Sequence, residues 1–283
     1  MFSALLKLIA ALPLSAIHGL GAALGLLVYQ CSPTYRRRLR ENLLGSGIPG
    51  APGLTGTVAR ETGKGALELA ALWFASEKRV VGWMHCGTWT AVEEAQARGK
   101  GIIFITPHLG GFEISALYAV RQLPLTVMYR PPKLKWLEPA MLAGRQRFGA
   151  RAVPATASGV RAFLRALRAG GTVGLLPDQT PGAGEGTWAP FFGRPAYTMT
   201  LIRRLQAATG AALIMARTER LPRGAGFRID FEEIPAEGFD EAALNRAVEA
   251  AVRRCPAQYL WGYNRYKHPA AAPPPPPPPA PPS

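Results

Sequence analysis

The stretch GKGIIFITPHLGGFEI, from Gly99 to Ile114, predicts more about the fold than any other part of the chain. Its apolar run from Gly101 to Thr106 predicts a buried strand. His108 and Glu113 follow this strand, five positions apart, and two glycines lie between them. A carboxylate that holds one imidazole nitrogen leaves the other nitrogen to face a substrate hydroxyl. The stretch therefore predicts a general base. The alternative is that His108 is a structural residue and that Glu113 is present because a negative charge is favourable at the start of a helix.

Four more apolar runs predict further strands, and helical patterns alternate with them. The strands are expected at residues 125–129, 172–176, 211–216 and 227–231, and the helices at 57–74, 112–122, 134–148, 158–169, 198–209 and 240–253. This alternation predicts an α/β fold with a largely parallel central sheet flanked by helices. Ligands bind such sheets beyond the carboxyl ends of the strands, where His108, Arg130 and Asp178 are expected.

The segment LLPDQTPGAGEGTWAPFFGRPA, Leu175 to Ala196, leads from a strand into a loop rich in Gly and Pro, with Asp178 and Gln179 at its start. Phe191 and Phe192 either line an acyl-chain channel or pack this loop. Arg130 either clamps a phosphate or carboxylate or is a solvated residue at a strand end. The sequence has no Gly-x-Ser-x-Gly, His-Glu-x-x-His or complete Walker motif, which disfavours a serine hydrolase, a zincin and an ATPase.

The chain is strongly basic. Its 33 Lys and Arg against 18 Asp and Glu give a net charge of +15, which favours an anionic partner such as phospholipid, a phosphorylated glycolipid or an acidic carrier protein. Because the basic residues are scattered and the N-terminus is lipophilic, nucleic acid is not expected as a partner. The three widely spaced cysteines suggest reduced thiols in a domain that faces the cytosol, and they form no zinc motif.

We predict three regions: a membrane-anchoring segment at 1–30, a catalytic domain at 31–268 and a disordered Pro/Ala-rich tail at 269–283. Only Lys7 and His18 interrupt the apolar N-terminal segment, and an arginine cluster that follows it should stay on the cytoplasmic side. Pro13 and several glycines keep a kinked interfacial helix open as an alternative to a span, and a secretory signal is the other rival. Residues 45–56 are expected to form a loop.

Taken together, these strings resemble the bacterial late acyltransferases of lipid A biosynthesis, within the lysophospholipid acyltransferase superfamily. The resemblance rests on four blocks in order: GKGIIFITPHLGGFEI with its His-x4-Glu motif, VMYRPPK, LLPDQTPGAGEGTWAPFFGRPAYT and QYLWGYNRYK. Gly262, Tyr263 and Asn264 depart from the family's closing signature, as does the polyproline tail. These departures put the acceptor in doubt more than the reaction.

The resemblance implies acyl transfer from a thioester, usually acyl carrier protein, to a lipid hydroxyl at the cytoplasmic face of the bacterial inner membrane. His108 would take the hydroxyl proton while Glu113 holds the imidazole, and no metal or cofactor would be needed. The other implied site residues bind substrate. Backbone amides of Gly110 and Gly111 would stabilise the oxyanion, Arg130 and Arg194 would hold a phosphate of an anionic lipid acceptor, Asp178 and Gln179 would shape the site floor, and Phe191 and Phe192 would line the acyl chain.

Two alternatives stay open. Within the enzyme class, the alternative is transfer to another lipid, such as a lysophospholipid, an aminolipid or a pigment lipid. For either acceptor, the sequence leaves open whether carrier protein or coenzyme A is the donor. From a different class, the chain is a non-catalytic membrane-bound protein that binds lipid or carrier protein, which the intact pair of His108 and Glu113 disfavours.

Overall fold

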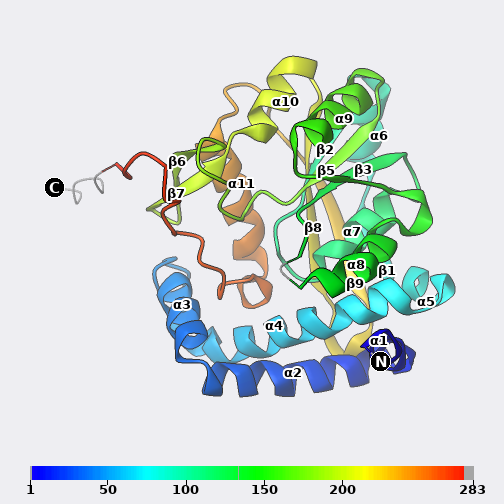
Figure 1. Ribbon diagram of the computed structural model, residues 1–283, viewed down its shortest axis with the longest axis vertical. Coiled ribbons are helices and arrows are strands. Elements are labelled where there is room, and N and C mark those ends of the chain that lie inside the picture. The colour runs from blue at the N-terminus through cyan, green and yellow to red at the C-terminus, as the bar shows by residue number, and fades with distance from the viewer. Residues whose placement is uncertain (1, 133, 277–283) are drawn as a thin grey trace.

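A computed structural model describes residues 2–132 and 134–276 and has a seven-stranded sheet at its centre (Figure 1). The strand order is β1-β9-β8-β2-β5-β3-β4, and every neighbouring pair is parallel except β8 and β9. The strands are β1 (Met84–Thr88), β2 (Ile102–Ile105), β3 (Leu125–Tyr129), β4 (Arg151–Pro154), β5 (Thr172–Leu175), β8 (Ala212–Arg220) and β9 (Phe227–Ile234). The predicted α/β class with a largely parallel sheet is confirmed.

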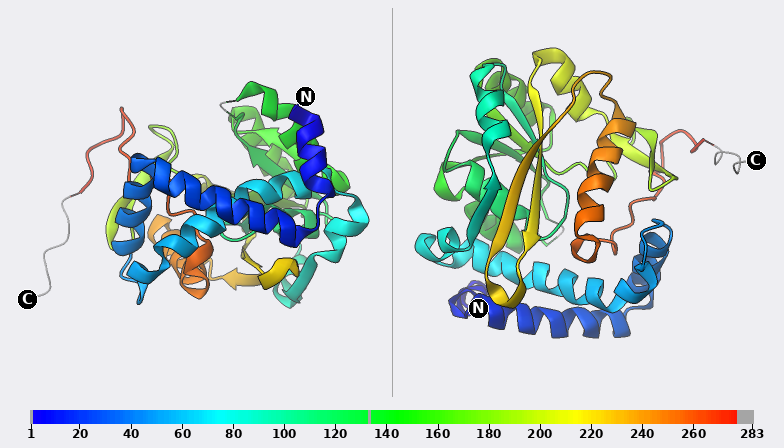
Figure 2. Two further views of the ribbon diagram at one scale, coloured as in Figure 1. Left: turned by 90° about the horizontal axis from the view of Figure 1, so that it is seen from below. Right: turned by 180° about the vertical axis from the view of Figure 1, so that it is seen from behind.

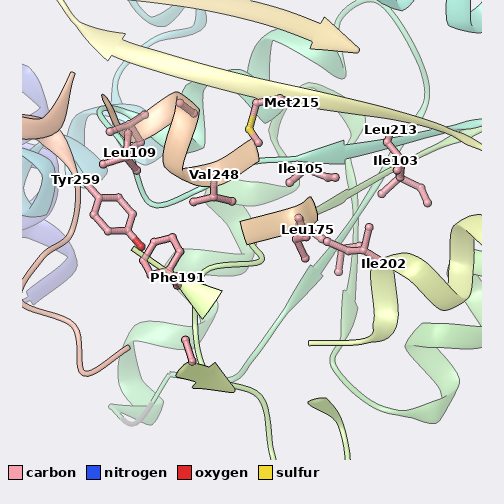
Figure 3. Packing of buried hydrophobic residues seen from close by; sticks show 14 of the residues in the cluster. Ile103, Ile105, Leu109, Leu175, Phe191, Ile202, Leu213, Met215, Val248 and Tyr259 are labelled. Atoms are coloured by element: carbon pink, nitrogen blue, oxygen red, sulfur yellow. The ribbon is translucent and has the colours of Figure 1, made fainter. Parts of the chain in front are cut away.

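Helices cover both faces of the sheet. They are α5 (Glu77–Gly82), α6 (Thr90–Ala97), α7 (Phe112–Ala119), α8 (Glu138–Arg145), α9 (Ala157–Arg168), α10 (Leu201–Thr209) and α11 (Glu241–Arg254). Because side chains alternate along a strand, Ile103 and Ile105 of β2 join one hydrophobic cluster while Ile102 and Phe104 join the other. Figure 3 shows the first cluster, in which Val248 of α11 packs near the strand residues. A strand buried on both faces explains the continuous apolar run at this position.

All five predicted strands are present, and β1 and β4 are two that the sequence did not predict. Both are short and lie at the two edges of the sheet, where side chains are less buried and the apolar signal is weak. The hairpin of β6 (Gly186–Phe191) and β7 (Arg194–Met199) was also missed, within the segment expected to be a loop.

Four helices form the N-terminal part of the chain. They are α1 (Phe2–Ala11), α2 (Leu14–Cys31), α3 (Pro33–Leu44) and α4 (Ala51–Phe74). Pro13 separates α1 from α2, as its missing N–H favours. By length and composition α2 could cross a membrane, and it packs against α4 at the base of the molecule (Figure 1). The predicted loop at 45–56 is wrong from Ala51 onward, because α4 begins there and has Pro52 in its first turn, where the missing N–H of proline needs no partner.

The start of the predicted tail makes defined contacts. Ala272 donates its backbone N–H to the Pro269 carbonyl in a turn, and the Trp188 indole of β6 donates to the Pro273 carbonyl at 2.8 Å. The described part of the tail therefore begins with a turn packed on the β6–β7 hairpin. Residues 277–283 of the predicted region lie outside the described residues.

Candidate active site

The site begins where β2 and β5 end side by side. Ile105 of β2 pairs with Leu175 of β5, and His108 and Asp178 each follow three residues later. The His108 imidazole Nδ1 lies 2.8 Å from Asp178 Oδ1, and the His108 backbone N–H donates to Asp178 Oδ2 at 2.9 Å. One carboxylate thus holds both the ring and the backbone of His108. Equal offsets past paired strand ends bring the two residues together.

This contact assigns a direction to the imidazole. An ionised Asp178 can only accept, so Nδ1 carries the hydrogen, and in the neutral imidazole Nε2 is then left as an acceptor. The Gln179 side-chain nitrogen lies 3.2 Å from Nε2, in position to donate to it. The His108 side chain is 15% exposed, which is enough for a substrate to approach. A neutral imidazole oriented by a buried carboxylate is the arrangement of a general base.

Asp178 is buried, and its surroundings keep it charged. Burial alone would raise the pKa of Asp178, but attraction to the protonated form of His108 and the hydrogen bonds from the His108 ring and backbone bring this pKa below its ordinary value. The buried Tyr259 hydroxyl lies beside the same carboxylate, and burial together with the Asp178 charge raises the pKa of Tyr259 well above 10. At neutral pH the site therefore contains an ionised Asp178 next to a neutral phenol.

Glu113 does not hold the imidazole. It lies in the first turn of α7 and is buried, and the Arg145 side chain of α8 donates to its Oε1 from Nε at 2.9 Å and from Nη2 at 2.5 Å. Within the described part of the chain, no hydrogen bond joins Glu113 to His108. The predicted contact between them is replaced by the one with Asp178, because α7 turns Glu113 toward α8.

Gly110 and Gly111 let the loop after His108 pack closely on the sheet. Gly110 has a φ of +57°, and a Cβ there would lie 2.2 Å from the Thr218 carbonyl oxygen; a Cβ on Gly111 would lie 2.4 Å from the Phe227 ring. The Gly110 N–H donates to the Gln258 carbonyl at 3.1 Å, so this amide is already used. Of the two amides expected to bind an oxyanion, only that of Gly111 has no acceptor among the described residues.

The closing segment from Gln258 onward fastens the two loops of the site. Leu260 donates its N–H to the His108 carbonyl at 3.2 Å, next to a bridge between Leu109 and Tyr259. On the other loop, the Thr180 N–H donates to the Tyr263 hydroxyl at 3.0 Å. Reasoning from the sequence gave these residues no role in the site, although the density of aromatic and basic residues here was the available signal.

Among the described residues, the other predicted substrate-binding residues make no hydrogen bond, ion pair or ring contact with His108. Arg130 is exposed beyond β3, with Nη2 3.4 Å from Glu185 Oε2, and the Arg194 guanidinium lies 3.7 Å from the centre of the Tyr266 ring. Phe191 and Phe192 are buried in the aromatic core, where Phe191 lies beside Tyr259 (Figure 3). The two rings therefore pack the hairpin, which is the other of the roles that the sequence left open.

An apolar pocket lies over the carboxyl-terminal parts of β3 and β5 and the end of β2, between the sheet and the helices α7 and α8. Its lining is Thr106, Phe112, Glu113, Ala116, Leu117, Val127, Met128, Arg145, Gly174, Leu175 and Leu176. The ion pair of Glu113 and Arg145 is thus the charged part of a largely apolar wall. Among the described residues, no group of three His, Cys, Asp or Glu side chains is placed to hold a metal ion.

Comparison with known proteins supports the family resemblance. The family model described as bacterial lipid A biosynthesis acyltransferase matches residues 1–268. The chain is 25% identical to the lipid A biosynthesis palmitoleoyltransferase of Escherichia coli, over 84% of this chain and 75% of that protein. It is 27% identical to the lauroyltransferase of the same organism, over 72% and 69%, and 30% identical to a lipid A biosynthesis acyltransferase of Haemophilus influenzae, over 60% and 55%.

Proposed function

The chain belongs to the bacterial lipid A biosynthesis acyltransferase family, and on this premise we propose that it moves a fatty acyl chain from a thioester donor to a hydroxyl of a lipid A precursor. The chain is an acyltransferase, as the names of its relatives support. The observation that carries the proposal is the contact of His108 with Asp178, which leaves Nε2 of the neutral imidazole as an acceptor. The centre of the His108 ring lies 4.8 Å from that of Phe112, which lines the apolar pocket.

The reaction follows from this geometry. Nε2 of His108 takes the proton of the acceptor hydroxyl as its oxygen attacks the thioester carbonyl, and Asp178 stabilises the imidazolium. Collapse of the tetrahedral intermediate breaks the carbon–sulfur bond, and the imidazolium returns the proton to the departing thiolate. The Gly111 amide is the backbone donor available to the oxyanion. The Gln179 amide, which lies 3.2 Å from Nε2, has to move aside for the hydroxyl.

Glu113 takes a different part in this scheme. Since Arg145 holds it in the pocket wall, we propose that Glu113 acts as a positioning residue for α7 and the loop that carries His108. The charge of Arg145 makes the burial of this carboxylate possible. The general base is then His108 with Asp178, and Glu113 holds α7 and the His108 loop in position.

The apolar pocket is our candidate for the acyl chain. Its lining includes Thr106 and Phe112, which precede and follow His108 in the sequence. An acyl group bound in the pocket would therefore have its carbonyl near the imidazole. The names of the relatives specify different acyl chains, palmitoleoyl and lauroyl, so membership of the family does not determine the length used here.

Gly174 offers a test of this pocket. A Cβ at this position would lie 3.3 Å from Val127 Cγ1, in the pocket lining, so Gly174→Ala should shorten the space for the chain. Each methylene that no longer fits changes kcat/KM by about 10- to 200-fold. We expect transfer to move toward shorter donors, measured with a mixture of acyl thioesters. Gly53→Ala on α4, where nothing lies within 4 Å of the added methyl, is the matched control. An equal loss for all chain lengths would place the acyl chain elsewhere.

For the acceptor, we propose that Arg130 binds a phosphate; Arg194 pairs with Phe191 at the opposite end of the β6–β7 hairpin from Glu185 and stacks on Tyr266, so it is not part of this site. Arg130 follows β3, which is two strands from β2, or about 10 Å at the usual strand spacing. Among the described residues, Arg130 pairs with the exposed Glu185, and a phosphate can displace this exposed pair at little cost. The net charge of +15 suits both an anionic lipid and an acidic carrier protein at the cytoplasmic face of the inner membrane.

The deciding experiment is an assay of the purified full chain with a phosphorylated lipid A precursor and either acyl carrier protein or coenzyme A as the acyl thioester, analysed by mass spectrometry. We expect the precursor to gain one acyl mass, faster with the carrier protein. Lysophospholipid and aminolipid acceptors are included in parallel. Acylation of one of these lipids alone would show that the acceptor is not a lipid A precursor. No transfer to any acceptor would favour the non-catalytic alternative.

A further inference from the structure

One face of α2 is apolar, exposed and without charge. The helix buries Leu14, Ile17, His18, Gly21 and Gly25, and the side chains that stay exposed on it are all uncharged. The large ones recur at helical spacing: Leu20 (54% exposed), Leu24 (41%), Leu27 (55%) and Val28 (42%). Figure 2, left, shows this helix lying across the lower face of the molecule. A continuous apolar stripe of this kind on a protein surface indicates a partner that covers it.

The contact between α2 and α4 determines how a membrane can cover this face. At the middle of α2, a Cβ on Gly25 would lie 2.0 Å from the Ala59 carbonyl oxygen, and one on Gly63 would lie 2.0 Å from the Gly21 carbonyl oxygen. The two helices therefore touch backbone to backbone. If α2 crossed a bilayer at right angles to its plane, this part of α4 would be at the centre of the bilayer as well.

That part of α4 is charged. Arg60, Glu61 and Lys64 flank Gly63, and Glu68 follows one turn later. Ionised side chains at the centre of a bilayer are strongly unfavourable. A crossing α2 would have to leave α4, which would also break the buried contact between His18 and Glu68 at 3.1 Å. The structure therefore excludes a span that keeps the α2–α4 contact.

Basic side chains lie at both ends of the apolar stripe. Lys7 is exposed on α1, and Arg36, Arg37, Arg38 and Arg40 follow the other end of α2 on α3. The corner between α1 and α2 is also held to the domain, because Arg79 donates to the carbonyls of Ala10 at 2.6 Å and Leu12 at 2.5 Å. An apolar helix face bracketed by positive charge matches the acyl chains and headgroups of an anionic bilayer.

We propose that α2 lies in the plane of the membrane, with Leu20, Leu24, Leu27 and Val28 inserted among the acyl chains of anionic phospholipid, and does not cross the bilayer. The inference is independent of the proposed reaction. It has one consequence for the site, since a Cβ on Gly111 would lie 3.3 Å from Glu68 Oε1 of α4. The loop that carries His108 therefore lies only one helix layer above the membrane-bound α2.

Vesicle binding tests the inserted face. The full chain is sedimented with vesicles of phosphatidylglycerol or of phosphatidylcholine. We expect the double variant Leu24→Asp with Leu27→Asp to bind phosphatidylglycerol vesicles at least about tenfold more weakly than the parent, with an unchanged melting temperature. Leu44→Asp is the matched control, since Leu44 is 42% exposed but lies at the far end of α3, where Gly45 is beside Arg194 of β7. Unchanged binding by the double variant, or equal binding to both lipids, would overturn the proposal.

Labelling distinguishes the in-plane helix from a span. Ser15 and Cys31 are exposed near the two ends of α2. Two proteins with a single cysteine are made in a Cys86→Ser and Cys255→Ser background. One retains Cys31, and the other carries Ser15→Cys together with Cys31→Ser. Each is labelled with a membrane-impermeant maleimide in sealed inverted vesicles. We expect both sites to react from the same, cytoplasmic side. Reaction of the Ser15→Cys site only from the opposite side would show that α2 crosses the membrane.

Discussion

Replacing Asp178 with asparagine should lower kcat for acyl transfer by about 10²- to 10⁴-fold, the range for losing an oriented general base. Asp178 accepts the Nδ1 hydrogen of His108 and so leaves Nε2 ready to take a proton. An asparagine amide can instead donate to Nδ1, which favours the tautomer with hydrogen on Nε2. The measurement is the initial rate of acyl transfer at saturating donor and acceptor.

Two further variants make this result specific. His108→Ala combined with Asp178→Asn should be no slower than His108→Ala alone, because Asp178 acts through the imidazole. Glu113→Gln is the comparison variant: it leaves Arg145 without its charged partner, so we expect it to lose activity only together with stability. An Asp178→Asn enzyme within about threefold of the parent, beside an inactive but stably folded Glu113→Gln enzyme, would return the bracing role to Glu113.

Replacing Glu68 with glutamine should lower the free energy of unfolding by about 3–5 kcal/mol, because it leaves the buried Arg220 without its main partner. Arg220 donates to Glu68 through Nε at 2.6 Å and Nη2 at 2.7 Å, and Glu61 accepts from Nη1 at 2.6 Å. The backbone N–H of Arg220 donates to the Gln258 side-chain oxygen, and the Gln258 side-chain nitrogen donates to the Arg220 carbonyl. Loss of the pair would therefore also loosen the segment that holds Gly110.

Chemical denaturation of the full chain measures this effect, with Glu41→Gln as the matched control. Glu41 pairs with Arg37 at 3.8 Å on the exposed face of α3, and such pairs contribute about 0–1 kcal/mol. Combining Glu68→Gln with Arg220→Met should recover much of the lost stability, because the double variant removes the uncompensated charge. If Glu68→Gln lowered the free energy of unfolding no more than Glu41→Gln, the buried network would contribute no more to stability than an exposed ion pair.

The same pair makes stability depend on pH. Burial alone would raise the pKa of Glu68, but the charge and hydrogen bonds of Arg220, helped by His18, bring this pKa below its ordinary value of 4.5. A carboxyl whose pKa is lower in the folded protein stabilises the fold above the ordinary pKa and loses that contribution as the pH falls below it. We expect the free energy of unfolding to drop below pH 4.5 more steeply for the parent than for Glu68→Gln.

The sequence alone determined the central strands of the sheet and showed that the site lies at the carboxyl ends of those strands. Apolar runs predicted β2, β3 and β5 because strands covered on both faces are rich in apolar side chains on both faces, as β2 shows with four in a row. The two edge strands lack that signal. The contact between α2 and α4 was also beyond local patterns, because it depends on glycines that are 38 residues or more apart in the chain, such as Gly25 and Gly63.

Only the tertiary structure decided which acid holds the imidazole. Glu113 is five positions from His108, and proximity in the sequence made it the natural choice, whereas Asp178 is 70 residues away. The pairing of Ile105 with Leu175 places both loops at the same height on neighbouring strands, and the helix that starts at Phe112 turns Glu113 toward Arg145. Strand order is set by the packing of the whole sheet, so no local pattern specifies which strand ends become neighbours.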